Sequence, residues 1–402
     1  MAKTYDVIVV GAGMVGALEA SLLAQKNLRV ALIDQSSGKV TLSSPPRYDT
    51  RVSALSSASQ ALLERVGVWQ TIAPNRLAHY QAMKVWDGLG SGAIEFTAMD
   101  NQLTALGCLV ENAVLTQALL TSIAAAPQIE TFFAEKVLAC KVLPDKVSIE
   151  LASGLQLEAA LLVAADGANS FIRQQAGFAT VEWDYGHHAI VATIEVDKPH
   201  QATAWQAFGE EGILALLPLP SVAGRHIMSI VWSVSPADAA ALCQLDEAAF
   251  CRRLGYAIGR QFEVLALHSE RTAIPLRQRH AQHYVQARIA LVGDAAHTIH
   301  PLAGQGANIG FADAGALADI IAKAHARADD IGRERVLRRD LRARMLQSLQ
   351  MSASMEGFKR LYASQSPLLV LARNKGLNWL SRCGPFKKAV IAQALGDVVA
   401  KE

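Results

Sequence analysis

The sequence lacks the features that mark a disulfide-bonded, zinc-binding or membrane-spanning protein. Its five cysteines are scattered, and the closest pair, Cys243 and Cys251, is eight residues apart, so no CxxC motif and no zinc-ligand spacing is present. No stretch reaches the roughly 18 uninterrupted apolar residues of a transmembrane helix. No basic leader with a cleavage site precedes the first strand. We therefore expect a cytoplasmic protein with reduced cysteines and no bound metal.

Charge is scarce and evenly balanced. Charged residues make up 18% of the 402 residues, and 38 Lys and Arg residues oppose 36 Asp and Glu residues. A protein that binds nucleic acid would want a concentrated basic surface, so this balance argues against such a partner. The 51% of hydrophobic residues can form a large core, and the length suggests two or three domain-sized units.

A glycine-rich turn stands close to the amino terminus. Residues 5–34 read YDVIVVGAGMVGALEASLLAQKNLRVALID, which predicts a strand, a GxGxxG turn, a helix and a second strand. Gly11 permits the tight turn, Gly13 lets the backbone approach a pyrophosphate, and Gly16 lets the helix lie close to the strand. Asp34 ends the second strand and is placed to accept hydrogen bonds from a ribose diol. The pattern therefore predicts a dinucleotide site, and the acid argues against a 2′-phosphate.

Two later segments repeat the change from apolar strand to glycine turn to helix. They are LLVAADGANSFIRQQAG at 161–177 and VGDAAHTIHPLAGQGANIG at 292–310. Ligands of open parallel sheets lie across the carboxyl ends of the strands, and three such ends need a ligand longer than one mononucleotide. The Asp-Gly turn of the first segment is also common in plain loops, so a structural role stays open for it. No second GxGxxG is present, because GLGSG at 88–92 has the wrong spacing.

In this order and at these distances, the three segments resemble the fingerprints of the single-component flavin aromatic hydroxylases. The resemblance implies the para-hydroxybenzoate hydroxylase type of α/β fold. An FAD-binding Rossmann-like domain then holds an inserted antiparallel β-sheet substrate domain, and a helical region follows. The implied bounds are 1–76, 101–178 and 279–345 for the FAD-binding domain, 77–100 and 179–278 for the substrate domain, and 346–402 for the C-terminal helical region.

The same resemblance implies which residues hold FAD. The first turn binds the pyrophosphate, Asp294 the ribityl chain, the 301–306 loop faces the isoalloxazine, and Arg51 contacts the flavin side. Asp166 and Arg173 belong to a motif that serves both FAD and the passing NAD(P)H. Asn112 stands where many relatives carry Arg. The predicted FAD-binding residues are Gly11, Gly13, Met14, Val15, Gly16, Asp34, Arg51, Asn112, Asp166, Gly167, Gly293, Asp294, Pro301, Gly304, Gln305, Gly306 and Asn308.

The segments VWDG, WDYGHHAIVATI, GILALLPL and IVWSVSP extend the resemblance to the ubiquinone-biosynthesis hydroxylases over essentially the whole chain. The 183–219 stretch looks most like the enzymes that hydroxylate a polyprenylphenol ring at C5. The implied cycle uses NAD(P)H to reduce FAD and O₂ to form a C4a-hydroperoxide, whose distal oxygen attacks the phenol. The favoured reaction converts 2-octaprenylphenol to 2-octaprenyl-6-hydroxyphenol. Three alternatives stay open: a later ring position in the same pathway, an isoprenoid reductase or epoxidase, and a scaffold of the biosynthetic complex that retains flavin for stability.

Acid-base and substrate residues are less sharply indicated. His187 and His188 are the catalytic candidates, because one of two adjacent strand residues should face the inner side of the sheet. A hydrogen-bonded structural histidine is the alternative for each. Trp205, Phe208 and Trp232 are candidates for the substrate pocket, with an ordinary core role as the alternative.

The carboxyl-terminal region pairs apolar with basic residues. The two short amphipathic helices expected within residues 366–402 either cover the core or dock onto a membrane surface or other ubiquinone-biosynthesis proteins. A homo-oligomer is also left open. The basic stretch at 332–347 predicts a solvated helix face.

Overall fold

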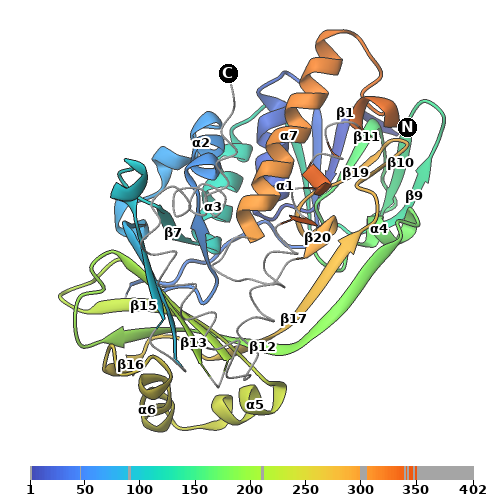
Figure 1. The fold of residues 1–402 in the computed structure, drawn as a ribbon. Helices are drawn as coiled ribbons and strands as arrows, with labels where there is room; N and C mark the ends of the chain where they lie inside the picture. Colours follow the sequence, from blue (N-terminus) through green and yellow to red (C-terminus); the bar gives the residue numbers. More distant parts are fainter. Residues whose placement is uncertain are drawn as a thin grey trace.

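The computed structural model describes residues 2–45, 47–88, 92–209, 212–298, 306–338, 341, 344–346 and 349–350. These residues form three β-sheets, and helices pack on the two larger ones (Figure 1). Most of the predicted C-terminal helical region lies outside the described residues, and so do Pro301, Gly304 and Gln305. No helix of the described part is long and apolar enough to cross a membrane.

The first sheet has eight strands. Its order is β18-β19-β11-β1-β2-β8, and β10 and β9 continue from β11. The strands β19, β11, β1, β2 and β8 run parallel, and β1, β2 and β11 are apolar on both faces, as strands covered on both sides require. The bounds are β1 (Lys3–Val10), β2 (Val30–Asp34), β8 (Ile129–Phe133), β9 (Val137–Val142), β10 (Val147–Leu151), β11 (Gln156–Ala164), β18 (Val285–Gln286) and β19 (Ile289–Leu291).

Helix α1 packs between α3 and α7 over this sheet (Figure 1). The three helices and the parallel strands share the largest hydrophobic core. The helix bounds are α1 (Met14–Ala24), α2 (Ser57–Arg65), α3 (Asn112–Ala124), α4 (Phe171–Gln175) and α7 (Gly306–Ala326), and the 3₁₀ turns are η1 (Trp69–Thr71), η2 (Pro74–Arg76), η3 (Ala98–Asn101) and η4 (Gly293–Ala295).

The second sheet has nine strands in the order β20-β17-β12-β15-β14-β13-β5-β6, with β16 paired to β12. Its two longest strands, β12 and β17, run up to the first sheet (Figure 1). Helices α5 (Pro236–Gln244) and α6 (Glu247–Ala257) cover one face and form a separate core with it. The strand bounds are β5 (Ala82–Asp87), β6 (Ala93–Thr97), β12 (Thr180–Val196), β13 (Thr203–Gly209), β14 (Gly212–Pro218), β15 (His226–Val234), β16 (Val264–Leu267), β17 (Thr272–Ala281) and β20 (His297–Thr298).

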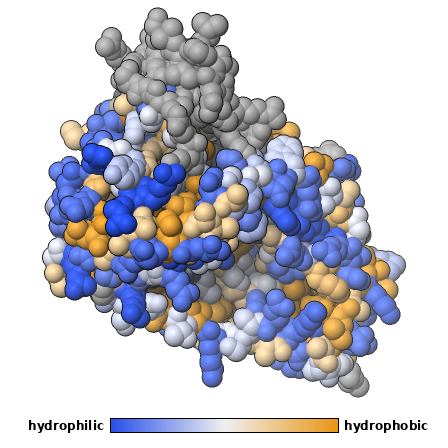
Figure 2. Space-filling model, turned by 90° about the horizontal axis from the view of Figure 1, so that it is seen from below, coloured by the Kyte–Doolittle hydropathy of each residue, from blue (hydrophilic) through white to orange (hydrophobic). Residues whose placement is uncertain are grey.

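The other face of the second sheet packs toward the predicted FAD-binding domain, called the FAD-binding part below. There the third sheet, β3 (Val52–Leu55), β7 (Gly107–Glu111) and β4 (Ala78–Tyr80), shares a small apolar core with β14 and β15. Two short strands depart from the proposed domain bounds, because β4 pairs with β7 and β20 pairs with β17. Figure 2 shows the molecule from the side of α5 and α6, where hydrophobic residues are interspersed with hydrophilic ones.

One buried side chain of α1 is at odds with its surroundings. Glu19 is 0% exposed, and neither of its carboxyl oxygens has a hydrogen-bond partner in the described part of the chain. Burial, with a smaller contribution from Asp313 and Asp319 of α7, raises the pKa of Glu19 well above its ordinary 4.5. Burial therefore favours the protonated form of the Glu19 side chain in the folded protein.

This burial predicts a pH-dependent cost in stability. The unfolded chain ionises Glu19 as the pH rises through 4.5, whereas the folded chain keeps the proton to much higher pH. The free energy of unfolding therefore decreases with rising pH across that window. We expect Glu19→Gln to raise the thermal unfolding midpoint by about 2 °C or more at pH 8 and by much less at pH 4.5.

The matched control is Glu64→Gln on the exposed side of α2, where the carboxylate accepts a bond from Gln60 at 2.8 Å. Its effect should be small and the same at both pH values. Equal gains for Glu19→Gln at pH 4.5 and pH 8 would show that Glu19 is not held neutral.

Candidate active site

Three loops meet at the carboxyl ends of neighbouring parallel strands. The first loop (residues 11–16) follows β1, the second loop (165–170) follows β11, and the third loop (293–298) follows β19. Because β11 lies between β1 and β19, the parallel pairing brings the three loops together at one edge of the sheet. This edge is where ligands of open parallel sheets bind.

The glycines of the first loop differ in what surrounds them. A Cβ atom on Gly11, whose φ is +104°, would lie 2.3 Å from the carbonyl oxygen of Ala165 in the second loop. A Cβ on Gly16 would lie 1.9 Å from the carbonyl oxygen of Gly11. A Cβ on Gly13 would meet no atom within 4 Å. Packing therefore demands glycine at 11 and 16, while the space in front of Gly13 is open to a ligand.

The amino terminus of α1 opens onto the same space. Gly13 precedes the helix, and no side chain caps the free N–H groups of its first turn. These donors and the positive end of the helix dipole together favour an anion such as a pyrophosphate. The arrangement supports the role predicted for the first loop.

Asp34, at the end of β2, braces the first loop from the side. Its Oδ2 accepts the N–H of Ala12 at 2.6 Å, and its Oδ1 accepts the N–H of Ser36 at 2.7 Å. Each carboxylate oxygen has a second lone pair, so these bonds leave acceptor capacity for a ribose hydroxyl. The ribose contact of Asp34 stays a prediction.

The second loop carries an acid that is only half satisfied. Asp166 accepts the N–H of Ile172 at 3.2 Å through Oδ2, while its buried Oδ1 has no hydrogen-bond partner in the described part of the chain. Burial raises the pKa of Asp166, and its hydrogen bonds oppose that shift. A buried acceptor without a donor at this edge is what a ligand hydroxyl or N–H would satisfy.

Arg173 joins the second loop to the third. Its side chain is buried, and its guanidinium donates to the carbonyl oxygens of Ala168 at 2.7 Å and Ala295 at 2.9 Å. The sequence assigned Arg173 to a motif that serves FAD and NAD(P)H. The structure gives its donors to the protein, so we infer that Arg173 acts by holding the two loops at a fixed separation.

Small residues also bring the first and third loops into contact. Gly293 adopts a φ of +58°, and a Cβ there would approach the side chain of Val15 at 3.2 Å. A Cβ on Gly310 in α7 would approach the same side chain at 2.6 Å. Val15, predicted to contact the cofactor, thus fills the space between the first loop, the third loop and α7.

Asp294 stands in the third loop, directly after Gly293. Its side chain is exposed to solvent, yet the surrounding protein desolvates the carboxylate and raises its pKa, against the charges of His297 and Arg51. The structure thereby brings Arg51 and Asp294, which are 243 positions apart in the sequence, to the same region.

The backbone of Arg51 is held by the start of α3. Asn112 donates its N–H to the carbonyl oxygen of Arg51 at 2.9 Å, and Glu111 accepts the N–H of Asp49 at 2.7 Å. Glu111 also pairs at 2.7 Å with Arg76, both side chains being largely buried. Burial raises the pKa of Glu111, and the bonds from Asp49 and Arg76 counteract this.

The remaining predicted contacts fall into two groups. Asn112 and Asn308 use their side-chain amides within the protein: Asn112 accepts the hydroxyl of Ser53, and Asn308 bonds Ser59 and the backbone of residues 54 and 56. We infer that Asn308 fixes the start of α7. Met14 belongs to the first loop, Gly167 to the second loop, and Gly306 is the first residue of α7.

The two candidate histidines lie on opposite faces of the second sheet. His187 Nδ1 is 3.2 Å from Ser233 Oγ, on the face that packs toward the FAD-binding part through Val231. His188 pairs with Val234, whose side chain belongs to the core beneath α5 and α6. His187 is therefore the histidine on the face opposite α5 and α6, which is called the cleft side below.

Side chains alternate between the two faces along each strand, and this alternation also assigns the three aromatic candidates to a face. Trp205 and Trp232 pack in the core beneath α5 and α6, and Trp232 is 1% exposed. This placement favours the ordinary core role that the sequence left open for these two residues, because their strands turn them toward α5 and α6. Phe208 points to the opposite face from Trp205, since it is three positions further along β13.

Sequence reasoning missed two polar residues on the cleft side. The Tyr185 hydroxyl donates to the side-chain oxygen of Gln278 on the neighbouring strand. Gly186, with a φ of +64°, interrupts the pairing of β12 with β17 just after Tyr185. A glycine inside an alternating strand is the one signal that could have indicated this change of register.

Comparison with known proteins agrees with this geometry. The family model described as FAD binding domain matches residues 4–333. The chain is 35% identical over 400 residues to the 3-demethoxyubiquinol 3-hydroxylase of Escherichia coli, covering 97% of this chain and 98% of that protein. It is 32% identical over 437 residues to the ubiquinone biosynthesis monooxygenase COQ6 of Xenopus tropicalis, covering 97% and 93%.

The chain belongs to the flavin hydroxylase family of ubiquinone biosynthesis. Among solved structures, p-nitrophenol 4-monooxygenase PnpA of Pseudomonas putida superposes with a TM-score of 0.76 at 20% identity, covering 98% of each chain. PqsL of Pseudomonas aeruginosa gives 0.75 at 20% identity, covering 94% of this chain and all of that one. These matches confirm the predicted fold class, and the family confirms an FAD-dependent monooxygenase that uses NAD(P)H.

The residues present fit FAD in this hydroxylase. The open space at Gly13 and the uncapped helix suit a pyrophosphate, while the orphaned oxygen of Asp166 and the exposed carboxylate of Asp294 offer acceptors. We propose that the first loop holds the pyrophosphate and that Asp294 holds the ribityl chain.

The glycines allow cofactor binding to be separated from folding. Gly13→Ala adds a methyl group to open space at a φ of −67°, which suits any residue, so the protein should fold normally. The methyl group occupies the room that the pyrophosphate needs. We expect the dissociation constant of FAD to rise about tenfold or more, or roughly 1.4 kcal/mol, in a fluorescence titration of the apoprotein.

Gly255→Ala in α6 is the matched control, because its Cβ also meets no atom within 4 Å. It should leave FAD affinity unchanged. Gly16→Ala should instead destabilise the protein, since the added atom overlaps the backbone of Gly11. Normal FAD affinity in Gly13→Ala would exclude the first loop as the pyrophosphate site.

Proposed function

We propose that this hydroxylase acts on C5 of a polyprenylphenol, converting 2-octaprenylphenol to 2-octaprenyl-6-hydroxyphenol. The proposal rests on residues 183–219, whose amino-acid sequence resembles that of the C5 enzymes. This stretch forms most of β12, β13 and β14 of the second sheet, whose face opposite α5 and α6 packs against the third sheet. The predicted substrate domain is therefore the part of the chain that supports the proposed ring position.

A later ring position is the second candidate. The 35% identity to the E. coli protein named 3-demethoxyubiquinol 3-hydroxylase favours it. An isoprenoid reductase or epoxidase and a scaffold that retains flavin only for stability have less support, because the relatives named above carry names of hydroxylases or monooxygenases. The four possibilities predict different products.

The protein must orient the phenol and assist the loss of its proton. FAD, when bound and reduced by NAD(P)H, supplies the activation of O₂ for transfer of one oxygen atom to the ring. His187, tied to Ser233 on the cleft side, is the group we assign to accept the phenolic proton. Tyr185 and Phe208 lie on the same side and would border the ring. Their packing restricts water near the reacting atoms.

The hydrophobic tail of the proposed substrate indicates which partners could deliver it. A polyprenylphenol resides in a bilayer or a lipid-binding complex, so we propose that the protein receives it at a membrane surface or from other ubiquinone-biosynthesis proteins. The amphipathic segment 366–402, outside the described residues, is the proposed docking element. A homo-oligomer remains part of the same proposal.

The two adjacent histidines give a direct test of the proton acceptor. His187→Gln should lower kcat for hydroxylation of a short-chain prenylphenol about 100-fold, the usual contribution of a general base. FAD content should not change, because His187 lies outside the three loops. The measurement is product formation per flavin under saturating NAD(P)H.

His188→Gln serves as the control, since the same change is made one residue away on the opposite face. Its kcat should stay within threefold of the wild type. Equal losses in both variants, or none in His187→Gln, would remove His187 from the mechanism.

The ring position is tested by complementation. We expect this gene to restore ubiquinone in a bacterial strain that lacks the C5 hydroxylase and not in strains that lack a later hydroxylase. Mass spectrometry of the quinone intermediates identifies the step that is restored. Rescue only of the strain that lacks 3-demethoxyubiquinol hydroxylation would replace the C5 proposal by the second candidate, and unchanged intermediates in every strain would refute both.

A further inference from the structure

A carboxylate beneath the third loop binds three separate parts of the protein. Asp313 of α7 is 0% exposed. Its Oδ2 lies 2.5 Å from His297 Nε2 and accepts the N–H of Gly293 at 3.3 Å, while its Oδ1 accepts the Nε–H of Arg344 at 3.2 Å. No sequence motif singled out Asp313.

These bonds hold the third loop on both sides of Asp294. Asp313 fixes Gly293 before it and His297 after it, and Arg173 fixes the carbonyl of Ala295. The backbone of Asp294 therefore lies between three anchored neighbours. A loop held in this way keeps the carboxylate in place before a ligand arrives, so that binding costs less ordering.

Packing also fixes the orientation of the His297 ring. It packs against Tyr284 with ring centroids 5.6 Å apart, and β20 pairs His297 with His280 of β17. Tyr284 in turn lies 2.9 Å from His280 through its hydroxyl oxygen and the Nε2 atom. Rotation of His297 away from Asp313 would break this packing, so the Asp313–His297 contact is defined by the surroundings of both partners.

Arg344 extends the cluster to the segment after α7. Besides Asp313, its guanidinium donates to the carbonyl oxygen of Ile309 at 3.4 Å. The Arg344 guanidinium therefore pairs with a carboxylate, Asp313, that contacts the third loop directly. Arg344 thereby connects the helical residues 344–346 to the third loop through one buried carboxylate.

We propose that Asp313 is a positioning residue for FAD, which acts through His297 and Gly293 on Asp294 without touching the cofactor. Arg344 stabilises the same carboxylate, so the segment after α7 contributes to cofactor retention. This inference rests on the proposed role of Asp294 in holding the ribityl chain.

The test measures the rate at which FAD leaves the holoenzyme, followed by the rise in flavin fluorescence after dilution. Asp313→Asn keeps the shape of the side chain and removes the charge that strengthens its three bonds. We expect FAD release at least tenfold faster. Thermal unfolding of each apoprotein, measured in parallel, separates loss of the cofactor from loss of the fold.

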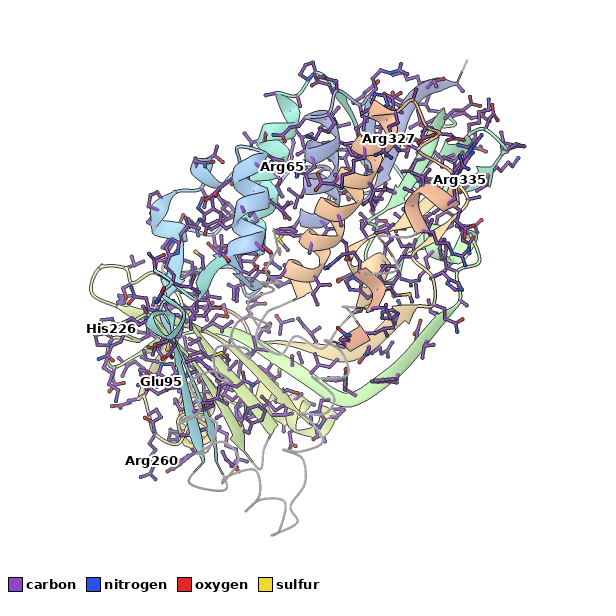
Figure 3. The ribbon with its side chains drawn as sticks, turned by 45° about the horizontal axis from the view of Figure 1, so that its top comes forward. Arg65, Glu95, His226, Arg260, Arg327 and Arg335 are labelled. Atoms are coloured by element: carbon purple, nitrogen blue, oxygen red, sulfur yellow. The ribbon has the colours of Figure 1, made fainter. Side chains whose placement is uncertain are left out.

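Asp319→Asn is the matched control on the same helix. Asp319 pairs at 2.9 Å with Arg65 of α2, which is labelled in Figure 3, and both side chains are partly exposed. Its loss should change FAD release by less than twofold. Equal effects of the two substitutions, or an unchanged release rate in Asp313→Asn, would overturn the proposal.

Substitutions of His297 decide the matter if Asp313→Asn does not fold. His297→Phe removes the donor, and His297→Gln offers an amide N–H in its place. We expect fast FAD release from the Phe variant and at least partial rescue by Gln. Equal release rates from both would overturn the proposal.

Asp294→Ala is measured beside these variants to separate the two levels of the argument. If it retains FAD normally, the proposed ribityl contact fails. If it loses FAD while the variants at 313 and 297 retain it, the ribityl contact stands and the positioning role fails.

Discussion

The site depends on a close approach of two backbones that only glycine allows. Gly11 lies so near the carbonyl of Ala165 that any Cβ would overlap it, and Gly16 lies equally close to Gly11. These contacts bring the first loop and the second loop together at one edge of the sheet. Arg173 connects the second loop to the third loop through two hydrogen bonds. Three turns from distant parts of the chain therefore meet at one edge of the sheet, because their strands are neighbours.

The second sheet provides the other wall. Its long strands β12 and β17 run from the region of α5 and α6 to the FAD-binding part, so each carries both core and cleft residues. The helix-covered face holds the large aromatic core, including Trp232 and Phe250. The face toward the flavin loops is mixed, with hydroxyl, imidazole and amide groups among smaller apolar side chains. This division lets one sheet anchor a domain and receive a substrate.

Much of this could be predicted from the sequence, because glycine turns after apolar strands leave a local pattern. The three loops were indicated in this way, and the resemblance to the flavin hydroxylases added the roles of Asp294 and Arg51. The faces of the second sheet could not be predicted, since Gly186 shifts the alternation and only the structure shows that Trp205 and Trp232 turn away from the cleft. Buried partners such as Asp313 and Glu111 have no motif, because their roles arise from contacts between residues far apart in the chain.

The most direct test of the account is a crystal structure of the protein with FAD. The central claim is that one FAD molecule spans all three loops. The account predicts its pyrophosphate at the amino terminus of α1 and a ribityl hydroxyl within hydrogen-bond distance of Asp294. A cofactor that contacts only the first loop, with Asp294 left facing solvent, would contradict it.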